Sequence, residues 1–179
     1  ITEESKEVIY AYGMELLISD VLNTIIVLLI ALFSHTLPAV VVFIAVFMGL
    51  RQFVGGFHAN SHLSCMFTLV MVMMVFSYGI CNVSGHITPI FSISFIMIAL
   101  PIILCIAPVP HPNKPMSEEK SVKLRKRSCI LAVTLSVVTI ALLVFQYQKL
   151  SLYVSSGMLL SAIMALLGHF LNRGDNSKR

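Results

Sequence analysis

The sequence contains few charged residues. Only 11% of its 179 residues are Asp, Glu, Lys or Arg, whereas 58% are hydrophobic, and an ordinary soluble domain has about 25% charged residues. Apolar runs that approach the roughly 20 residues needed to cross a bilayer recur along the whole chain, so no soluble domain of useful size fits between them. This composition excludes a soluble protein and predicts one all-α membrane domain over residues 1–179.

The signals of several common functional classes are also missing. The opening segment lacks a basic region and a small-residue cleavage site, so we expect no cleavable signal peptide. The chain has no Gly-rich phosphate loop, GxSxG motif or HExxH motif. Its cysteines, Cys65, Cys81, Cys105 and Cys129, match neither a zinc site nor a disulfide framework, and three of them are expected to be packing residues. We therefore expect no cofactor, no metal and no nucleic-acid partner.

The apolar segments predict a polytopic protein with about six transmembrane helices. The first two segments are short for spans, and a re-entrant hairpin is the alternative for them. An amphipathic helix at the membrane interface is expected over residues 1–19, because Val8, Tyr12 and Leu16 recur at helical spacing. The six segments lie at 18–33, 37–50, 65–82, 88–107, 128–146 and 152–171.

The distribution of Lys and Arg predicts the orientation of these helices. Basic residues accumulate in cytoplasmic loops, and six crossings from a cytoplasmic N-terminus place every Lys and Arg except Lys149 on the cytoplasmic side. A re-entrant hairpin would leave this parity unchanged. We therefore expect both termini and the polar segment 51–65 to face the cytoplasm.

The segment 108–127 is Pro-rich in its first half and basic in its second half. The prolines predict an extended, polyproline-like start, and we expect a cytoplasmic loop throughout. Two interpretations of the basic half remain open: a solvated loop close to anionic lipids, or a docking surface for an acidic partner segment. The basic residues are Lys120, Lys123, Arg125, Lys126 and Arg127.

The sequence RQFVGGFHANSHLSC, residues 51–65, interrupts the apolar pattern and contains the best candidates for chemistry. Cys65 is at the start of a predicted helix, where unpaired N–H groups and the helix dipole lower the pKa of a thiol. His62 lies three residues before it and would share its helical face. His58 lies seven residues before it, which is about 10.5 Å along a straight helix. A His58–Cys65 pair therefore requires a bend, which the weak helix formers of this segment permit.

Structural interpretations of the same residues remain open. A His and a Cys seven residues apart can occur by chance. Arg51 is either an anchor at the membrane boundary or a substrate-facing residue, and Gly55 and Gly56 either allow close helix packing or belong to the site.

The pattern of Arg51, Gly56, His58, Ala59 and Cys65, followed by AP, NKP and a basic run, resembles the accessory gene regulator protein B (AgrB) family of Gram-positive quorum sensing. The resemblance covers nearly the whole chain. It implies a cysteine endopeptidase in the bacterial cell membrane that processes an AgrD-like precursor of an autoinducing peptide.

The resemblance also implies roles for individual residues. Cys65 would be the nucleophile and His58 the base, so the resemblance favours His58 over His62. Arg51, Gly55 and Gly56 belong to the motif without an assigned chemical role.

Further expectations concern the site, the assembly and the alternative function. By analogy with papain-like sites, Asn60 or Ser61 could orient the imidazole of His58. The five basic residues of the segment 108–127 are candidates for docking the charged tail of the precursor. The family leads us to expect a homodimer, with the small residues of SSG and SAIMA near the C-terminus as one contact. The alternative function is a small transporter or channel, although the predicted spans contain no charged residue apart from Asp20, whereas intramembrane charges are typical of transporters.

Overall fold

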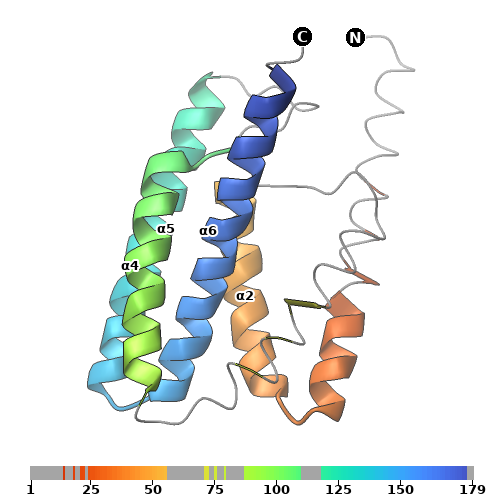
Figure 1. The fold of residues 1–179 in the computed structure, drawn as a ribbon, viewed down its shortest axis with the longest axis vertical. Coiled ribbons are helices and arrows are strands. Elements are labelled where there is room, and N and C mark those ends of the chain that lie inside the picture. The colour runs from red at the N-terminus through yellow and green to blue at the C-terminus, as the bar shows by residue number, and fades with distance from the viewer. Residues whose placement is uncertain are drawn as a thin grey trace.

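The computed structural model describes residues 21–22, 24–55, 87–109 and 118–176, together with the single positions 14, 18, 71, 72, 75 and 79. A short apolar helix, Thr24–Phe33, precedes the first long helix. No residue in the described ranges belongs to a β-strand, so the all-α prediction is confirmed for this part of the chain. The long helices are α2 (Leu37–Val54), α4 (Thr88–Ile106), α5 (Glu118–Val144) and α6 (Gln148–Asn176) (Figure 1).

The four long helices fit a multi-pass membrane protein. Each contains an apolar stretch long enough to cross a bilayer, so four of the predicted segments are confirmed as helices that are long and apolar enough to span it. The predicted span 65–82 and the interfacial helix over residues 1–19 lie almost entirely outside the described residues. In the segment 18–33, Ile18, Val21, Leu22 and Thr24–Phe33 are helical, and its other residues lie outside the described part. The total of six spans therefore stays a prediction.

Helix α5 begins earlier than the sequence analysis predicted. It starts at Glu118, so the basic run 120–127 belongs to the helix, and the prediction of a loop through residue 127 was wrong. Glu, Lys and Arg are good helix formers, and acidic residues at the N-terminus complement the helix dipole. Glu119 also accepts a hydrogen bond from Lys123 Nζ at 2.8 Å, one turn later.

Two tight turns with the same geometry join neighbouring helices. His35 and Gln146 have positive φ angles of 56° and 65°. At the first turn Thr36 N–H donates to Ala31 O at 3.0 Å, and at the second Tyr147 N–H donates to Leu142 O at 2.8 Å. This pattern is the Schellman motif, which pairs the last carbonyls of a helix with the backbone that follows it.

Helix α6 lies at the centre of the bundle. It contacts α2, α4 and α5. In its apolar stretch 61% of the residues are buried, compared with 22% in the apolar stretches of α4 and α5. The chain runs in one direction in α2, α4 and α6 and in the opposite direction in α5 (Figure 1). The C-terminal ends of α2 and α4 and the start of α5 therefore lie at one end of the bundle, which we call the Gly55 end. The turns at His35 and Gln146 lie at the other end.

Small residues of α6 allow this close packing. Ser155, Ser156, Ser161 and Ala162 are buried within the chain, and a Cβ added to Gly157 would lie 3.0 Å from Phe43 O and from Val46 Cγ1. The prediction that SSG and SAIMA form a dimer contact was wrong, because these segments mostly pack against helices of the same chain. A homodimer through another surface stays a prediction.

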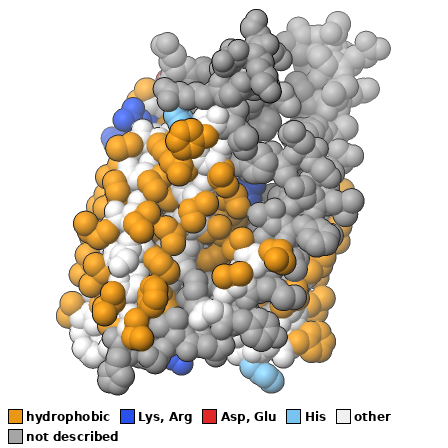
Figure 2. All heavy atoms as spheres, in the orientation of Figure 1, with side chains coloured by type: hydrophobic (Ala, Val, Ile, Leu, Met, Phe, Trp, Pro, Cys, Tyr) orange, Lys and Arg blue, Asp and Glu red, His pale blue; other side chains and the backbone are white. Residues whose placement is uncertain are grey.

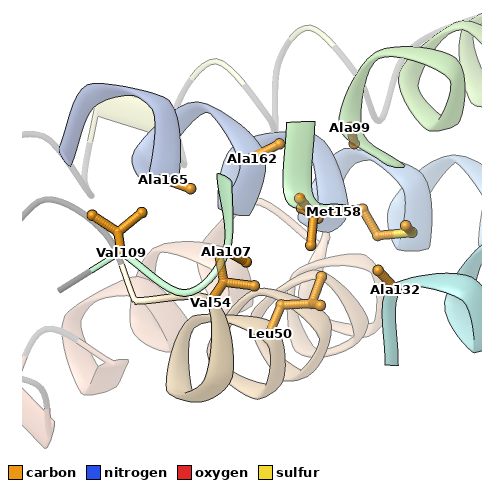
Figure 3. Packing of buried hydrophobic residues seen from close by; sticks show 10 residues of the cluster. Leu50, Val54, Ala99, Ala107, Val109, Ala132, Met158, Ala162 and Ala165 are labelled. Atoms are coloured by element: carbon orange, nitrogen blue, oxygen red, sulfur yellow. The ribbon is translucent and has the colours of Figure 1, made fainter. Parts of the chain in front are cut away.

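A hydrophobic cluster joins all four helices and reaches the Gly55 end. Figure 3 shows Val54, Ala107 and Val109 near one end of the cluster and Met158 and Ala132 farther along the bundle. All five residues are buried. The end of α2 and the segment after α4 are therefore held by the core.

Candidate functional site

The structure describes the first five residues of the segment 51–65, which are residues 51–55. Arg51 and Gly55 are described. The predicted His58–Cys65 pair and the bend between these residues therefore stay predictions. The other candidates, Gly56, His58, Asn60, Ser61, His62 and Cys65, lie outside the described residues.

Arg51 lies in the last turn of α2. Its Cζ atom lies 5.6 Å from the centroid of the Phe47 ring, one helical turn earlier, which is a cation–π geometry. The positive charge also complements the negative end of the helix dipole. These contacts do not distinguish between the two interpretations of Arg51, so the anchoring role and the substrate-facing role both stay predictions.

Gly55 ends α2 in a conformation that is almost restricted to glycine. Its φ and ψ angles are 73° and −152°, a region that residues with a side chain rarely enter. Its N–H still donates to Arg51 O at 3.0 Å, so the helical hydrogen bonding continues up to this residue. The change of direction therefore occurs at Gly55 itself.

A second feature of Gly55 is its close contact with the segment that follows α4. Gly55 and Val109 form an isolated parallel β-bridge, in which Val109 N–H donates to Val54 O at 2.9 Å. A Cβ added to Gly55 would lie 2.6 Å from Val109 O. The absence of a side chain at Gly55 thus allows the backbone of Val109 to come close. Because Val109 is not in a helix, this contact differs from the helix–helix packing that was the structural interpretation of this glycine.

The segment Ala107–Val109 was not recognised as part of the site from the sequence. Ala107, the last residue of the predicted span 88–107, has an extended backbone with φ −71° and ψ 143°. Val109 is buried, whereas a solvated loop was expected from residue 108 onwards. The one signal in the sequence is an apolar valine between two prolines, and such a signal cannot identify its partner.

The basic residues of α5 lie on two different faces of the helix. Lys123, Lys126 and Arg127 are exposed and share a face with the exposed Ile130 and Val133. Figure 2 shows Lys and Arg side chains near the start of α5, above a surface that is mostly hydrophobic. This face has the character of a helix that emerges from a bilayer, with cations above its apolar side chains.

Arg125 is also exposed, but it lies on the other face of the helix. It lies one and two turns before the buried Ser128 and Ala132, and its carbonyl accepts a hydrogen bond from Ser128 Oγ at 2.9 Å. Lys120 lies in the first turn, and its side chain is outside the described part. The predicted docking residues therefore do not form one surface. Among those with described side chains, Arg125 lies on the face of α5 that is turned toward the bundle, and Lys123, Lys126 and Arg127 lie on the opposite side.

The structure describes two of the four cysteines, Cys105 and Cys129. Cys105 is exposed and Cys129 is half-buried, so the prediction of a packing role was wrong for Cys105. Within the described ranges, no three His, Cys, Asp or Glu side chains come together as metal ligands would.

Comparison with known proteins identifies the family. The model of the family described as accessory gene regulator B, AgrB, matches residues 1–165, which include the whole segment 51–65. The chain belongs to the AgrB family.

A curated relative agrees with this assignment. A protein of Clostridium beijerinckii that is named as AgrB-like is 24% identical over 116 residues, which cover 63% of this chain and 56% of that relative. The match thus spans little more than half of the relative's length. No solved structure matches the chain.

Proposed function

We propose that this AgrB-family chain is a membrane-embedded cysteine endopeptidase that removes the C-terminal tail from an AgrD-like precursor of an autoinducing peptide. The family match over residues 1–165 carries the proposal, because it contains His58 and Cys65 within the motif. Helices long enough to cross a membrane and a fixed end of α2 agree with a site at the membrane boundary.

The first step forms an acyl-enzyme. His58 takes the proton of the Cys65 thiol, and Cys65 Sγ attacks the scissile carbonyl carbon of the precursor. Backbone N–H groups at a helix start could stabilise the oxyanion. The C–N bond then breaks, the leaving amine takes the proton from His58, and the tail departs. The retained peptide is left as a thioester on Cys65.

The second step closes the ring. A cysteine thiol or serine hydroxyl of the retained peptide attacks the thioester, its proton passes through His58 to Cys65 Sγ, and the free enzyme is regenerated. The product is a thiolactone or a lactone, and no water is consumed. Ring closure is favoured over hydrolysis because it is intramolecular and because a site at the membrane boundary can exclude water.

The proposal includes a location and partners. We place the site and both termini on the cytoplasmic side, because Arg51 and the basic residues of α5 lie at the Gly55 end. The precursor would approach along the bilayer interface with its charged tail near Arg125. Asn60 or Ser61 would orient His58, and the enzyme would work as a homodimer.

Co-expression with a precursor tests this function. We expect Cys65→Ala to abolish release of the tail and His58→Ala to reduce it by about 100-fold or more, the contribution of a general base. His62→Ala is the matched control, and we expect it to retain activity within about threefold. The released tail is measured by mass spectrometry. Tail release that persists in Cys65→Ala would disprove the proposal.

A further inference from the structure

The end of α2 is fixed by contacts from a distant part of the chain. Val109 N–H donates to Val54 O at 2.9 Å, and Val54, Ala107 and Val109 are buried in one cluster. The point at which the chain leaves α2 is therefore held by the core of the bundle and does not depend on the helix end alone.

The direction of the chain at this point depends on Gly55. A side chain would be unfavourable there for two independent reasons: the φ of 73° and ψ of −152°, and the 2.6 Å separation between an added Cβ and Val109 O. The second contact is with backbone, which cannot move aside as a flexible side chain could. Any substituent must therefore change the path of the chain or separate it from Val109.

The effect must reach His58, because the two residues are close in sequence. His58 is three positions after Gly55, and three fully extended residues span at most about 10 Å. The position of Gly55 therefore limits where the His58 backbone can lie. A proton acceptor must come within about 3 Å of its donor. A change of about 1 Å in the path of the chain at Gly55 could therefore lower the reaction rate by about 100-fold.

We propose that Gly55, through its contact with Val109, is a positioning residue that directs the chain so that His58 reaches Cys65. This inference rests on the proposed function, because it assumes the His58–Cys65 pair. It assigns Gly55 a role through His58 and no contact with the substrate.

The reactivity of Cys65 tests the inference without a precursor. A thiol paired with histidine is largely a thiolate near neutral pH, so its alkylation rate reports the pair. In a background that retains Cys65 alone, with the other three cysteines replaced by alanine, we expect His58→Ala to lower the iodoacetamide rate near neutral pH by about tenfold or more. We expect Gly55→Ala to lower it by about tenfold as well. At alkaline pH all variants should react at similar rates.

Two other glycines provide matched controls. Gly49→Ala adds the same methyl group where, apart from its chain neighbours and the nearby backbone of its own helix, no atom lies within 4 Å, and it should leave the rate unchanged. Gly157→Ala introduces a close contact with Phe43 O in the middle of the bundle. It should lower thermal stability without changing the pH dependence of Cys65. A merely structural role of Gly55 would make its variant behave like Gly157→Ala.

The outcomes separate the inference from the function on which it rests. If His58→Ala leaves the pH dependence unchanged, the proposed pair itself is wrong. If His58→Ala changes it and folded Gly55→Ala does not, the positioning role is wrong. Should Gly55→Ala fail to fold, Val109→Ala replaces it, because this change keeps the backbone hydrogen bond and loosens the buried contact. We expect it to lower the neutral rate by about threefold, and an unchanged rate would contradict the inference.

Discussion

At the scale of residues, three described glycines have different environments. A Cβ at Gly49 meets nothing within 4 Å, at Gly157 it meets α2 at 3.0 Å, and at Gly55 it meets Val109 O at 2.6 Å. The same substitution should therefore have three different consequences. Sequence alone cannot separate them, because each depends on what lies opposite the residue in the folded chain.

We predict that Gly157→Ala destabilises the packing of α6 against α2. The added methyl group overpacks a contact with backbone at Phe43 O, and overpacking costs about 1–3 kcal/mol in free energy of unfolding. Thermal unfolding in detergent measures the change. Gly49→Ala is the control and should be neutral or slightly stabilising, because alanine favours a helix over glycine by about 1 kcal/mol. Equal melting temperatures for both variants would contradict the packing described here.

The residues of the candidate site could be predicted only in part. The motif from Arg51 to Cys65 is local, so its residue types and spacing are visible in the sequence. The contact between Gly55 and Val109 joins segments that lie far apart along the chain, and no spacing rule links them. The glycine could be singled out, but its partner could not.

At the scale of elements, α5 shows where a hydropathy pattern is insufficient. The pattern ends the span where the basic residues begin, yet the backbone stays helical back to Glu118. Charged residues of high helix propensity extend a helix beyond the bilayer, because hydropathy and helix formation are separate properties. The apolar parts of the four long helices were predictable, because a long apolar run in a membrane is both hydrophobic enough to cross it and required to form a helix there.

The two faces of α5 lead to different expectations for its basic residues. We predict that Arg125→Gln lowers the cleavage of a precursor with an acidic tail by about threefold, the size of an exposed ion pair. The double variant Lys123→Gln with Lys126→Gln should leave cleavage unchanged, because these residues share the face of Ile130 and Val133 that we assign to lipid. Rates with a native and a neutralised tail measure the effect. If both variants lost the same fraction of the cleavage rate, the precursor tail would not be bound by one face of α5 in preference to the other.

At the scale of the whole molecule, the bundle brings separate parts of the sequence to one end. The end of α2, the segment after α4 and the basic start of α5 all lie at the Gly55 end (Figure 1). The alternation of spans in the sequence predicted this arrangement. The central place of α6 was not predicted, because its small polar residues are equally compatible with a contact between two chains.

The central claim is that Cys65 carries the peptide as a thioester. The most direct measurement uses a precursor in which the ring-closing cysteine or serine is replaced by alanine, so that the acyl-enzyme cannot cyclise. After an acid quench, intact mass spectrometry should find the enzyme heavier by the mass of the retained peptide, with the adduct on Cys65. No adduct, or an adduct on another residue while the tail is still released, would contradict the account.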